Sequence, residues 1–132
     1  IEWLPEYDNE NIVEEVFNRC DAIVVPSIWD ENSPLVIHEA QQCGVAVITA
    51  DHGGMGEYVQ DGVNGLTFTH RDVDSLRSSM QRALDNPDHV IQMGHRGYLF
   101  SEDGMIPSKE LHATEVLRCY EELLSTKVEV TY

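Results

Sequence analysis

The chain has 132 residues and carries 24 acidic against 8 basic side chains, which gives a formal net charge of −16 at pH 7. Such an acidic excess argues against binding to a nucleic-acid backbone or to an anionic membrane surface. The length suits one small domain or a part of a larger one. An apolar content of 42% is typical of a globular, soluble protein, and no apolar run approaches the roughly 20 residues of a membrane-spanning helix.

The cysteines and the start of the chain bear on its compartment and processing. Cys20, Cys43 and Cys119 are widely spaced, odd in number and without a CxxC pair. This spacing argues against a disulfide framework or a zinc site and favours a reducing compartment. The chain begins at Ile1 without a signal-peptide pattern. We therefore expect a cytoplasmic location, including the cytoplasmic face of a membrane, and a piece excised from a longer protein.

Two kinds of apolar pattern alternate along the chain. Short apolar runs predict strands, and a run without polar alternation is typical of a strand covered on both faces in a parallel sheet. Apolar residues that recur every three to four positions predict helices. We expect strands over residues 1–4, 22–25, 45–50 and 66–69. We expect helices from residue 11, over about 35–43, over about 73–85, from 87 to about 99, and from 107 to about 124.

Turn and capping residues separate these elements. Gly44 stands where a helix C-cap is expected, and Asp61 to Gly65 is a strong turn signal. Asp8 or Asn9 could cap the first helix, as Asp72 or Asp74 could cap a later one. The apolar stripe of the last helix predicts a core face. It consists of Ala113, Val116, Leu117, Tyr120, Leu123 and Leu124.

This alternation predicts an α/β fold with a mostly parallel sheet flanked by helices in a single domain. In open sheets of this kind, ligands bind outside the carboxyl ends of the strands. The loops at residues 27–34 and 51–57 each follow a predicted strand, so both should lie at that edge. The second contains the adjacent glycines Gly53 and Gly54, which allow a backbone to approach a ligand closely.

Two glutamates on the first of these segments are candidate binding residues. Glu31 lies in the loop, where its carboxylate could bind sugar hydroxyls or cap the next helix. Glu39 lies in that helix, where it could accept hydrogen bonds from a vicinal diol such as a ribose, or simply face solvent. The intervening N–H groups of Ser33, Leu35 and Val36 could hold a phosphate.

Three neighbouring residues qualify this interpretation. Pro34 has no N–H group and suits the first helical turn. His38 points about 100° away from Glu39 around the helix, so we expect packing or surface exposure rather than acid–base chemistry. No basic residue lies between Arg19 and Arg71. The cation that a diphosphate requires must therefore come from elsewhere in space, from a metal or from a segment outside the chain.

Five short motifs follow one another along the chain. They are Val25-Pro26-Ser27, Glu31-x7-Glu39-Ala40, Gly44-Val45-Ala46-Val47-Ile48, Gly53-Gly54-x-x-Glu57 and Asp61-Gly62-x-Asn64-Gly65-Leu66. Their order and spacing resemble the signature of glycosyltransferase family 4, whose members are retaining enzymes of GT-B fold. The resemblance covers about residues 1–87, and the tail at residues 100–124 is similar to the family's closing helices. In that fold the tail often crosses back to the N-terminal domain, which implies that part of the last helix is exposed in this chain.

The resemblance implies a Rossmann-like C-terminal domain that binds a nucleotide-diphosphate sugar for hexosyl-type transfer to a carbohydrate or lipid-linked acceptor. Glu31 would bind the donor sugar and is the candidate catalytic residue, and Glu39 would bind the ribose diol. The family reaction needs no metal ion or other cofactor and is described as front-face attack assisted by the leaving diphosphate. The other implied donor-binding residues are Asn32, Ser33, Leu35, Val36, Gly53, Gly54 and Glu57.

The chain also departs from the family pattern. The N-terminal acceptor domain and the first strands of the C-terminal domain, with their basic segment, are missing. The sheet would then expose two strand edges, at which copies could associate. Ser33 stands where an aromatic residue is common, and Pro34 where many relatives carry glycine. The alternatives are a non-catalytic nucleotide-sugar-binding or assembly module and an epimerase of GT-B fold, although the spacing of Glu31 and Glu39 favours the transferase.

Overall fold

Three short strands pair in parallel and in the order of the sequence. The structure is a computed structural model that describes residue 3 and residues 5–125. The strands are β1 (Ala22–Val25), β2 (Ala46–Ala50) and β3 (Gly65–Phe68), in the sheet order β1-β2-β3. Every residue of β2 is buried, including the polar Thr49, as expected of a parallel strand covered on both faces. The predicted α/β fold with a parallel sheet is confirmed.

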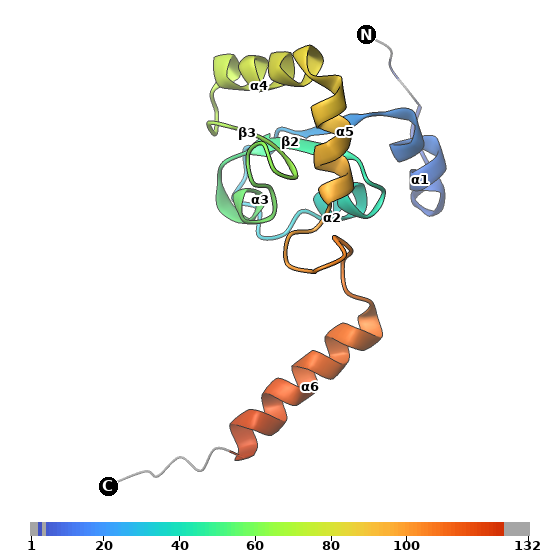
Figure 1. Ribbon diagram of the computed structural model, residues 1–132, viewed down its shortest axis with the longest axis vertical. Coiled ribbons are helices and arrows are strands. Elements are labelled where there is room, and N and C mark those ends of the chain that lie inside the picture. The colour runs from blue at the N-terminus through green and yellow to red at the C-terminus, as the bar shows by residue number, and fades with distance from the viewer. Residues whose placement is uncertain (1–2, 4, 126–132) are drawn as a thin grey trace, which may run out of the picture.

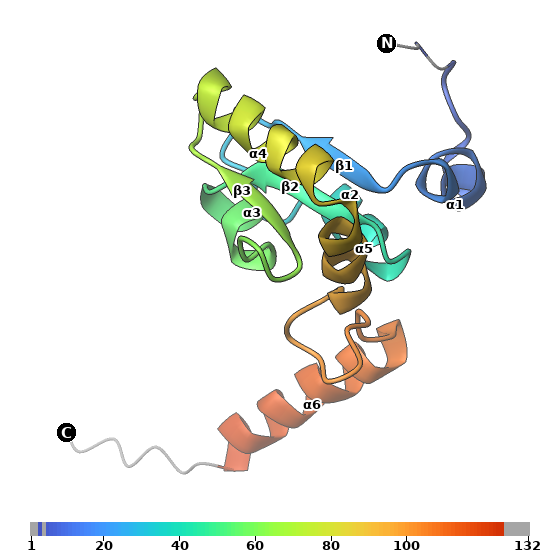
Figure 2. The same ribbon diagram turned by 45° about the horizontal axis from the view of Figure 1, so that its top comes forward.

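Helices cover both faces of this sheet. They are α1 (Ile12–Glu15), α2 (Leu35–Gln42), α3 (Gly53–Tyr58), α4 (Val73–Asp85), α5 (Pro87–Arg96) and α6 (Lys109–Ser125). Two 3-10 turns, η1 (Asn9–Asn11) and η2 (Phe17–Arg19), flank α1. As Figures 1 and 2 show, α4 lies on one side of the sheet and α2 and α3 lie on the other. Helix α5 contacts β2, α2 and α4, so it links the two layers.

The ends of the main helices follow the capping signals. Gly44 follows α2 with a φ of +72°, a conformation that glycine adopts without strain. Asp72 caps α4, because its side chain accepts hydrogen bonds from the N–H groups of Asp74 and Ser75. Helix α5 packs directly on the chain at Gly44, since a Cβ at Gly94 would overlap the Gly44 carbonyl oxygen.

Several predicted boundaries differ in the structure. The expected first helix is divided, because α1 ends at Glu15 and a 3-10 turn follows from Phe17. Asp8 caps the η1 turn that precedes α1. The segment predicted as a loop at residues 51–57 becomes helical from Gly53. Helix α5 ends earlier than expected because Gly97 has a φ of +58°. The strand predicted at residues 1–4 lies outside the described residues except for Trp3, which is exposed and belongs to no element.

Asn64 holds the turn before β3 against two other segments. Its side chain is buried, and its amide donates to the carbonyl oxygens of Tyr58 and Gly97, both at 2.9 Å. Its Oδ1 accepts from the N–H of Gln60 at 2.8 Å. The motif that signals a turn in the sequence therefore also joins the ends of α3 and α5, a role that turn propensity alone does not reveal.

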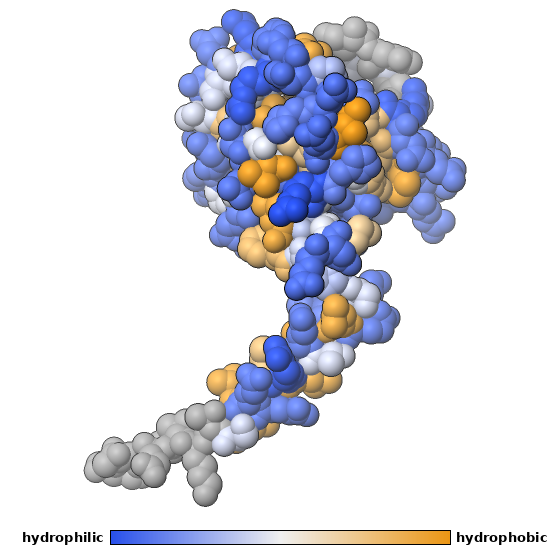
Figure 3. Space-filling view, viewed as in Figure 1, coloured by the Kyte–Doolittle hydropathy of each residue, from blue (hydrophilic) through white to orange (hydrophobic). Residues whose placement is uncertain are grey.

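Helix α6 projects away from the sheet, and none of its residues is buried (Figure 1). The predicted core role of its apolar stripe is therefore wrong in this chain. Figure 3 shows apolar surface along this helix, where Leu117 and Leu124 are 63% and 85% exposed. Apolar periodicity predicts that a face should be covered, but not which segment covers it. No helix in the described part of the chain is long and apolar enough to cross a membrane.

Candidate functional site

The loops that follow the three strands meet at the carboxyl edge of the sheet. The N–H of Gly54 at the start of α3 donates to the Glu31 carbonyl oxygen at 2.8 Å. Arg71, which follows β3, donates from Nη2 to the Ile28 carbonyl oxygen at 3.2 Å. The prediction that the loops at residues 27–34 and 51–57 share one edge is therefore confirmed, and the loop after β3 joins them.

The two glycines at the start of α3 allow close backbone packing. Gly53 has a φ of +54°, and a Cβ there would come within 2.9 Å of the Glu31 carbonyl oxygen. A Cβ at Gly54 would overlap the Asn32 carbonyl oxygen. These glycines thus support the segment that carries the candidate site, whether or not they also contact a ligand. Glu57 lies on the same short helix and is exposed.

Glu31 is oriented by a hydroxyl group rather than by the following helix. Ser27 Oγ donates a hydrogen bond to Glu31 Oε1 at 2.9 Å, and both residues are half-buried. Helix α2 has no hydrogen bond from a side-chain cap, so Glu31 does not cap it. Of the two roles that the sequence left open, capping is excluded, and the carboxylate keeps acceptor positions for a ligand.

The N-terminus of α2 is open. Pro34 is its N-cap residue, with an extended ψ of 115°, so it lies before the first helical turn rather than within it as the sequence suggested. Ser33 precedes it and bonds to His38 instead of the helix, with 2.7 Å between Oγ and Nε2. The first N–H groups of the helix, at Leu35 and Val36, thus have no side-chain cap. Such groups favour an anion because they lack internal partners and carry the positive end of the helix dipole.

Glu39 lies one turn further along α2 and is half-buried. The structure records no hydrogen bond to its carboxylate from any described residue. Its oxygens are therefore free to accept hydrogen bonds from a bound molecule. The structure thus brings together the open helix end, Glu31 just before it and Glu39 just after it on one strand–loop–helix segment.

Basic side chains from two other loops lie beside this segment. His52 Nε2 lies 2.7 Å from Asp30 Oδ1, and the rings of His52 and His70 stack with 4.2 Å between centroids. The hydrogen bond from His52 lowers the pKa of Asp30. With Arg71, which bonds to Ile28, these histidines supply positive or protonatable groups from within the chain. From its place before Gly53 and Gly54, His52 could be expected to contact a ligand, but its grouping with His70 and Arg71 was not predicted. A histidine after β2 and another after β3 are the signal for it.

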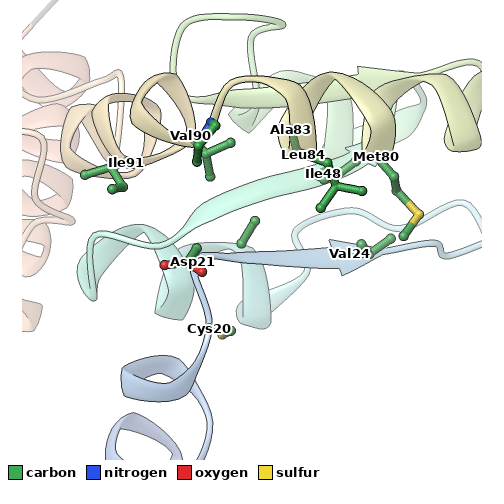
Figure 4. A pocket seen from close by; sticks show the side chains of 11 residues that line it. Cys20, Asp21, Val24, Ile48, Met80, Ala83, Leu84, Val90 and Ile91 are labelled. Carbon is green, nitrogen blue, oxygen red and sulfur yellow. The ribbon is translucent and has the colours of Figure 1, made fainter. Parts of the chain in front are cut away.

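A separate apolar pocket lies along β1, on the side of the sheet that faces α4 and α5 (Figure 4). It has a volume of about 480 Å³, and its lining includes Val24, Ile48, Met80, Leu84 and Ile91. Among the described strands β1 pairs only with β2, so its other edge is open. The lining of the pocket is mostly apolar, so it offers few polar groups for a nucleotide.

The chain is similar to several known glycosyltransferases in sequence. D-inositol 3-phosphate glycosyltransferase of Gordonia bronchialis is 32% identical over 88 residues, which are 67% of this chain and 19% of that protein. Glycogen synthase of Mycobacterium tuberculosis is 38% identical over 72 residues, which are 54% of this chain and 17% of that protein. The chain therefore spans about a fifth of the length of these relatives.

Solved structures show the same fold. Sucrose-phosphate synthase of Thermosynechococcus elongatus matches 92% of this chain and 29% of its own, with a TM-score of 0.71 and 24% identity, which supports the fold alone. Anabaena HepE in complex with UDP-glucose matches 86% of this chain and 29% of its own, with a TM-score of 0.62 and 25% identity.

The family assignment rests on a match over most of the chain. The family model described as "Glycosyl transferases group 1" matches residues 1–100. The resemblance to glycosyltransferases of GT-B fold that the five motifs predict is confirmed by this match and by the solved structures. The chain belongs to the family of glycosyl transferases group 1.

Proposed function

We propose that this chain is the donor-binding part of the C-terminal domain of a retaining glycosyltransferase. The reaction transfers a sugar from a nucleotide-diphosphate sugar to a carbohydrate or lipid-linked acceptor. The observation that carries the proposal is the open N-terminus of α2, which lies between Glu31 and Glu39. The similarity to HepE, a protein solved with UDP-glucose, supports a donor of this class.

Each part of the site has a proposed role. The N–H groups of Leu35 and Val36, at the uncapped helix end, hold the diphosphate together with the N–H of Ser33 in the loop just before it. Glu31, oriented by Ser27, binds hydroxyls of the donor sugar close to the reacting carbon. Glu39 accepts hydrogen bonds from the ribose diol. Asn32, Gly53, Gly54 and Glu57 complete the nucleotide pocket.

The reaction depends on placement more than on a side-chain nucleophile. In front-face transfer the acceptor attacks on the side that the diphosphate leaves, and a diphosphate oxygen takes the acceptor proton. Glu31 then orients the sugar and stabilises positive charge that develops at the reacting carbon. The cluster of His52, His70 and Arg71 lies beside this segment and contributes positive potential to the approaching donor.

The remaining parts of the enzyme are proposed to lie outside this chain. The open edge of β1 and the adjoining apolar pocket support further strands of the same domain at that position. The exposed stripe of α6 supports packing against an N-terminal acceptor domain. The chain alone is then inactive in transfer. Its three free cysteines support the cytoplasm as the location of the enzyme.

Calorimetric titration with a panel of nucleotide sugars, using the longer protein that contains this chain, tests the proposal. Glu39→Gln should weaken binding of the preferred donor about tenfold or more, because a charged hydrogen-bond acceptor is lost. Glu31→Gln should lower the transfer rate more than it lowers affinity. Glu14→Gln, an exposed change on α1, is the matched control. Normal turnover in a Glu31→Ala/Glu39→Ala protein would contradict the assignment.

A non-catalytic assembly module is the second candidate, and two observations favour it. The open edge of β1 can pair with another strand, and the α6 stripe exposes Leu123 and Leu124. This function predicts a stable complex with a partner or a second copy and no sugar transfer by that complex. Sedimentation combined with a transfer assay on the longer protein separates the two functions.

A further inference from the structure

The sequence before α2 favours a helix that starts at a different residue from the one observed. Serine is among the best N-cap residues, and proline is favoured at the first helical position that follows. Ser33-Pro34 therefore suits a helix capped by the Ser33 hydroxyl with Pro34 in its first turn. In the structure the helix begins one residue later, at Leu35, and Pro34 has an extended ψ of 115°.

His38 accounts for this difference. Its Nε2 lies 2.7 Å from Ser33 Oγ, so the hydroxyl that would cap α2 is engaged by a ring one turn along the same helix. The Ser33 oxygen would cap the helix by accepting a hydrogen bond from a backbone N–H, but its recorded hydrogen bond is the one with the ring. The ring contact and the missing cap therefore have one cause.

Neighbouring aromatic rings fix the position of His38. Tyr58, at the end of α3, meets its ring edge-on with 4.4 Å between centroids. Tyr98, which follows α5, lies at 6.0 Å, and Phe100 packs against both tyrosines. Burial of the ring lowers the pKa of His38, which favours the neutral imidazole near pH 7. The imidazole is therefore held by two other segments and does not depend on Ser33 for its orientation.

We propose that His38 is a positioning residue that keeps the N-terminus of α2 open for the donor by holding the Ser33 hydroxyl away from it. This inference rests on the proposed function, because the diphosphate is the ligand that the open helix end receives. Without His38, the Ser33 hydroxyl turns to the N–H groups of Leu35 or Val36 and competes with the phosphate oxygens. The residue predicted from the sequence only to pack or to face solvent thus controls access to the site.

The proposal predicts a pattern among three variants of the longer protein. His38→Leu should weaken binding of the preferred nucleotide sugar about fivefold, the effect expected when an N-cap hydrogen bond must be displaced. Ser33→Ala removes the hydroxyl and keeps the backbone N–H group, so it is the reference for the double variant. The double variant Ser33→Ala/His38→Leu should bind as tightly as Ser33→Ala, because no hydroxyl is left to compete. His89→Leu, at an exposed histidine of α5, is the control.

Amide hydrogen exchange without ligand provides the second measurement. The amides of Leu35 and Val36 should exchange fast in the wild type, more slowly in His38→Leu and fast again in the double variant. His38→Gln should restore fast exchange if its amide holds the hydroxyl as the imidazole does.

The possible outcomes separate this inference from the proposed function. Recovery of affinity and fast exchange in the double variant supports the role of His38, because a ring that only fills space would leave the double variant as weak as His38→Leu. A double variant as impaired as His38→Leu overturns the inference while leaving the donor site in place. A wild-type protein that binds no nucleotide sugar overturns the proposed function, and the exchange rates alone then decide whether His38 controls the helix end.

Discussion

Gly54 lies directly against the main chain of Asn32, and a Cβ at Gly54 would overlap the Asn32 carbonyl oxygen. Gly54→Ala should therefore displace the loop before α2 and destabilise the protein by about 3 kcal/mol. Gly62→Ala is the comparison, because Gly62, unlike Gly54, has a positive φ of +73° and has no atom within 4 Å of its Cβ position. It should cost about 1 kcal/mol of backbone strain. Urea unfolding measures the stability of both variants. Equal losses in the free energy of unfolding would show that the contact with Asn32 is unimportant.

Ser27 should matter for turnover through Glu31. The hydrogen bond of 2.9 Å from Ser27 Oγ holds one orientation of the Glu31 carboxylate. Ser27→Ala should lower the transfer rate of the longer protein about three- to tenfold, since one neutral-to-charged hydrogen bond is lost. Its effect should be absent in a Glu31→Ala background. Steady-state kinetics of the two single variants and the double variant measure this coupling, and additive effects would contradict it.

Outside the candidate site, Asn64 is the polar residue whose substitution should lower the stability of the protein most. Asn64→Ala leaves the carbonyl oxygens of Tyr58 and Gly97 and the N–H of Gln60 without this partner. We expect a loss of about 2–3 kcal/mol in the free energy of unfolding. Asn86→Ala, whose exposed amide donates one bond of 3.3 Å, should change it by less than about 0.5 kcal/mol. Chemical denaturation of the two variants gives the comparison.

The ion pair between Asp61 and Arg82 should give a pH-dependent contribution to stability. Burial would raise the pKa of Asp61, but the hydrogen bonds from Arg82 and from the Thr67 N–H outweigh it, so the pKa is lowered below its ordinary value of 3.8. The unfolded state then binds more protons near that value. The stabilisation is therefore present above about pH 4 and is lost as the pH falls through the lowered pKa.

Arg82→Gln tests this pair. Two of the hydrogen bonds to Asp61, each of 3.0 Å, are removed, and both side chains are about half exposed. We expect Arg82→Gln to lower the free energy of unfolding by about 1 kcal/mol at pH 7 and to differ less from the wild type near pH 3. Arg77→Gln, on the same helix, removes only one exposed contact of 3.3 Å and should have less effect. Equal losses in the two variants at pH 7 would contradict the prediction.

The stability of the part of the chain that precedes α6 should not depend on this helix. None of its residues is buried, so a chain that ends at Ser108 should unfold with a free energy within about 0.5 kcal/mol of the full chain. Thermal unfolding followed by circular dichroism measures this. A large decrease in stability would show that α6 packs on the rest of the chain in solution.

Local patterns were sufficient to predict the sheet and most helix ends. The segment at residues 45–50, apolar except for Thr49, predicts a buried parallel strand. Gly44 and Asp72 mark helix ends by capping that acts within a few residues. The shared edge of the strand-end loops follows from the parallel sheet itself. These features are predictable because their causes lie close together in the sequence.

The features that the sequence did not predict depend on contacts between segments. The Ser33 hydroxyl turns to His38 because rings from α3 and from the loop after α5 hold that imidazole. The stacking of His52 on His70 depends on the spacing of neighbouring strands. The apolar stripe of α6 predicts a buried face correctly only when a partner segment is present. In each case the outcome depends on which segments lie side by side, and local sequence patterns do not show that.

The order of the strands allows the sheet to form while the chain is being synthesised. Each described strand pairs with the next one along the chain, so β2 can join β1 as soon as it leaves the ribosome, and β3 can then join β2. No described strand must wait for a later one to be inserted between it and its neighbour. The loop that carries Glu31 and the helix α3 that supports it both precede α4 in the sequence, so this loop can fold before α4 has left the ribosome.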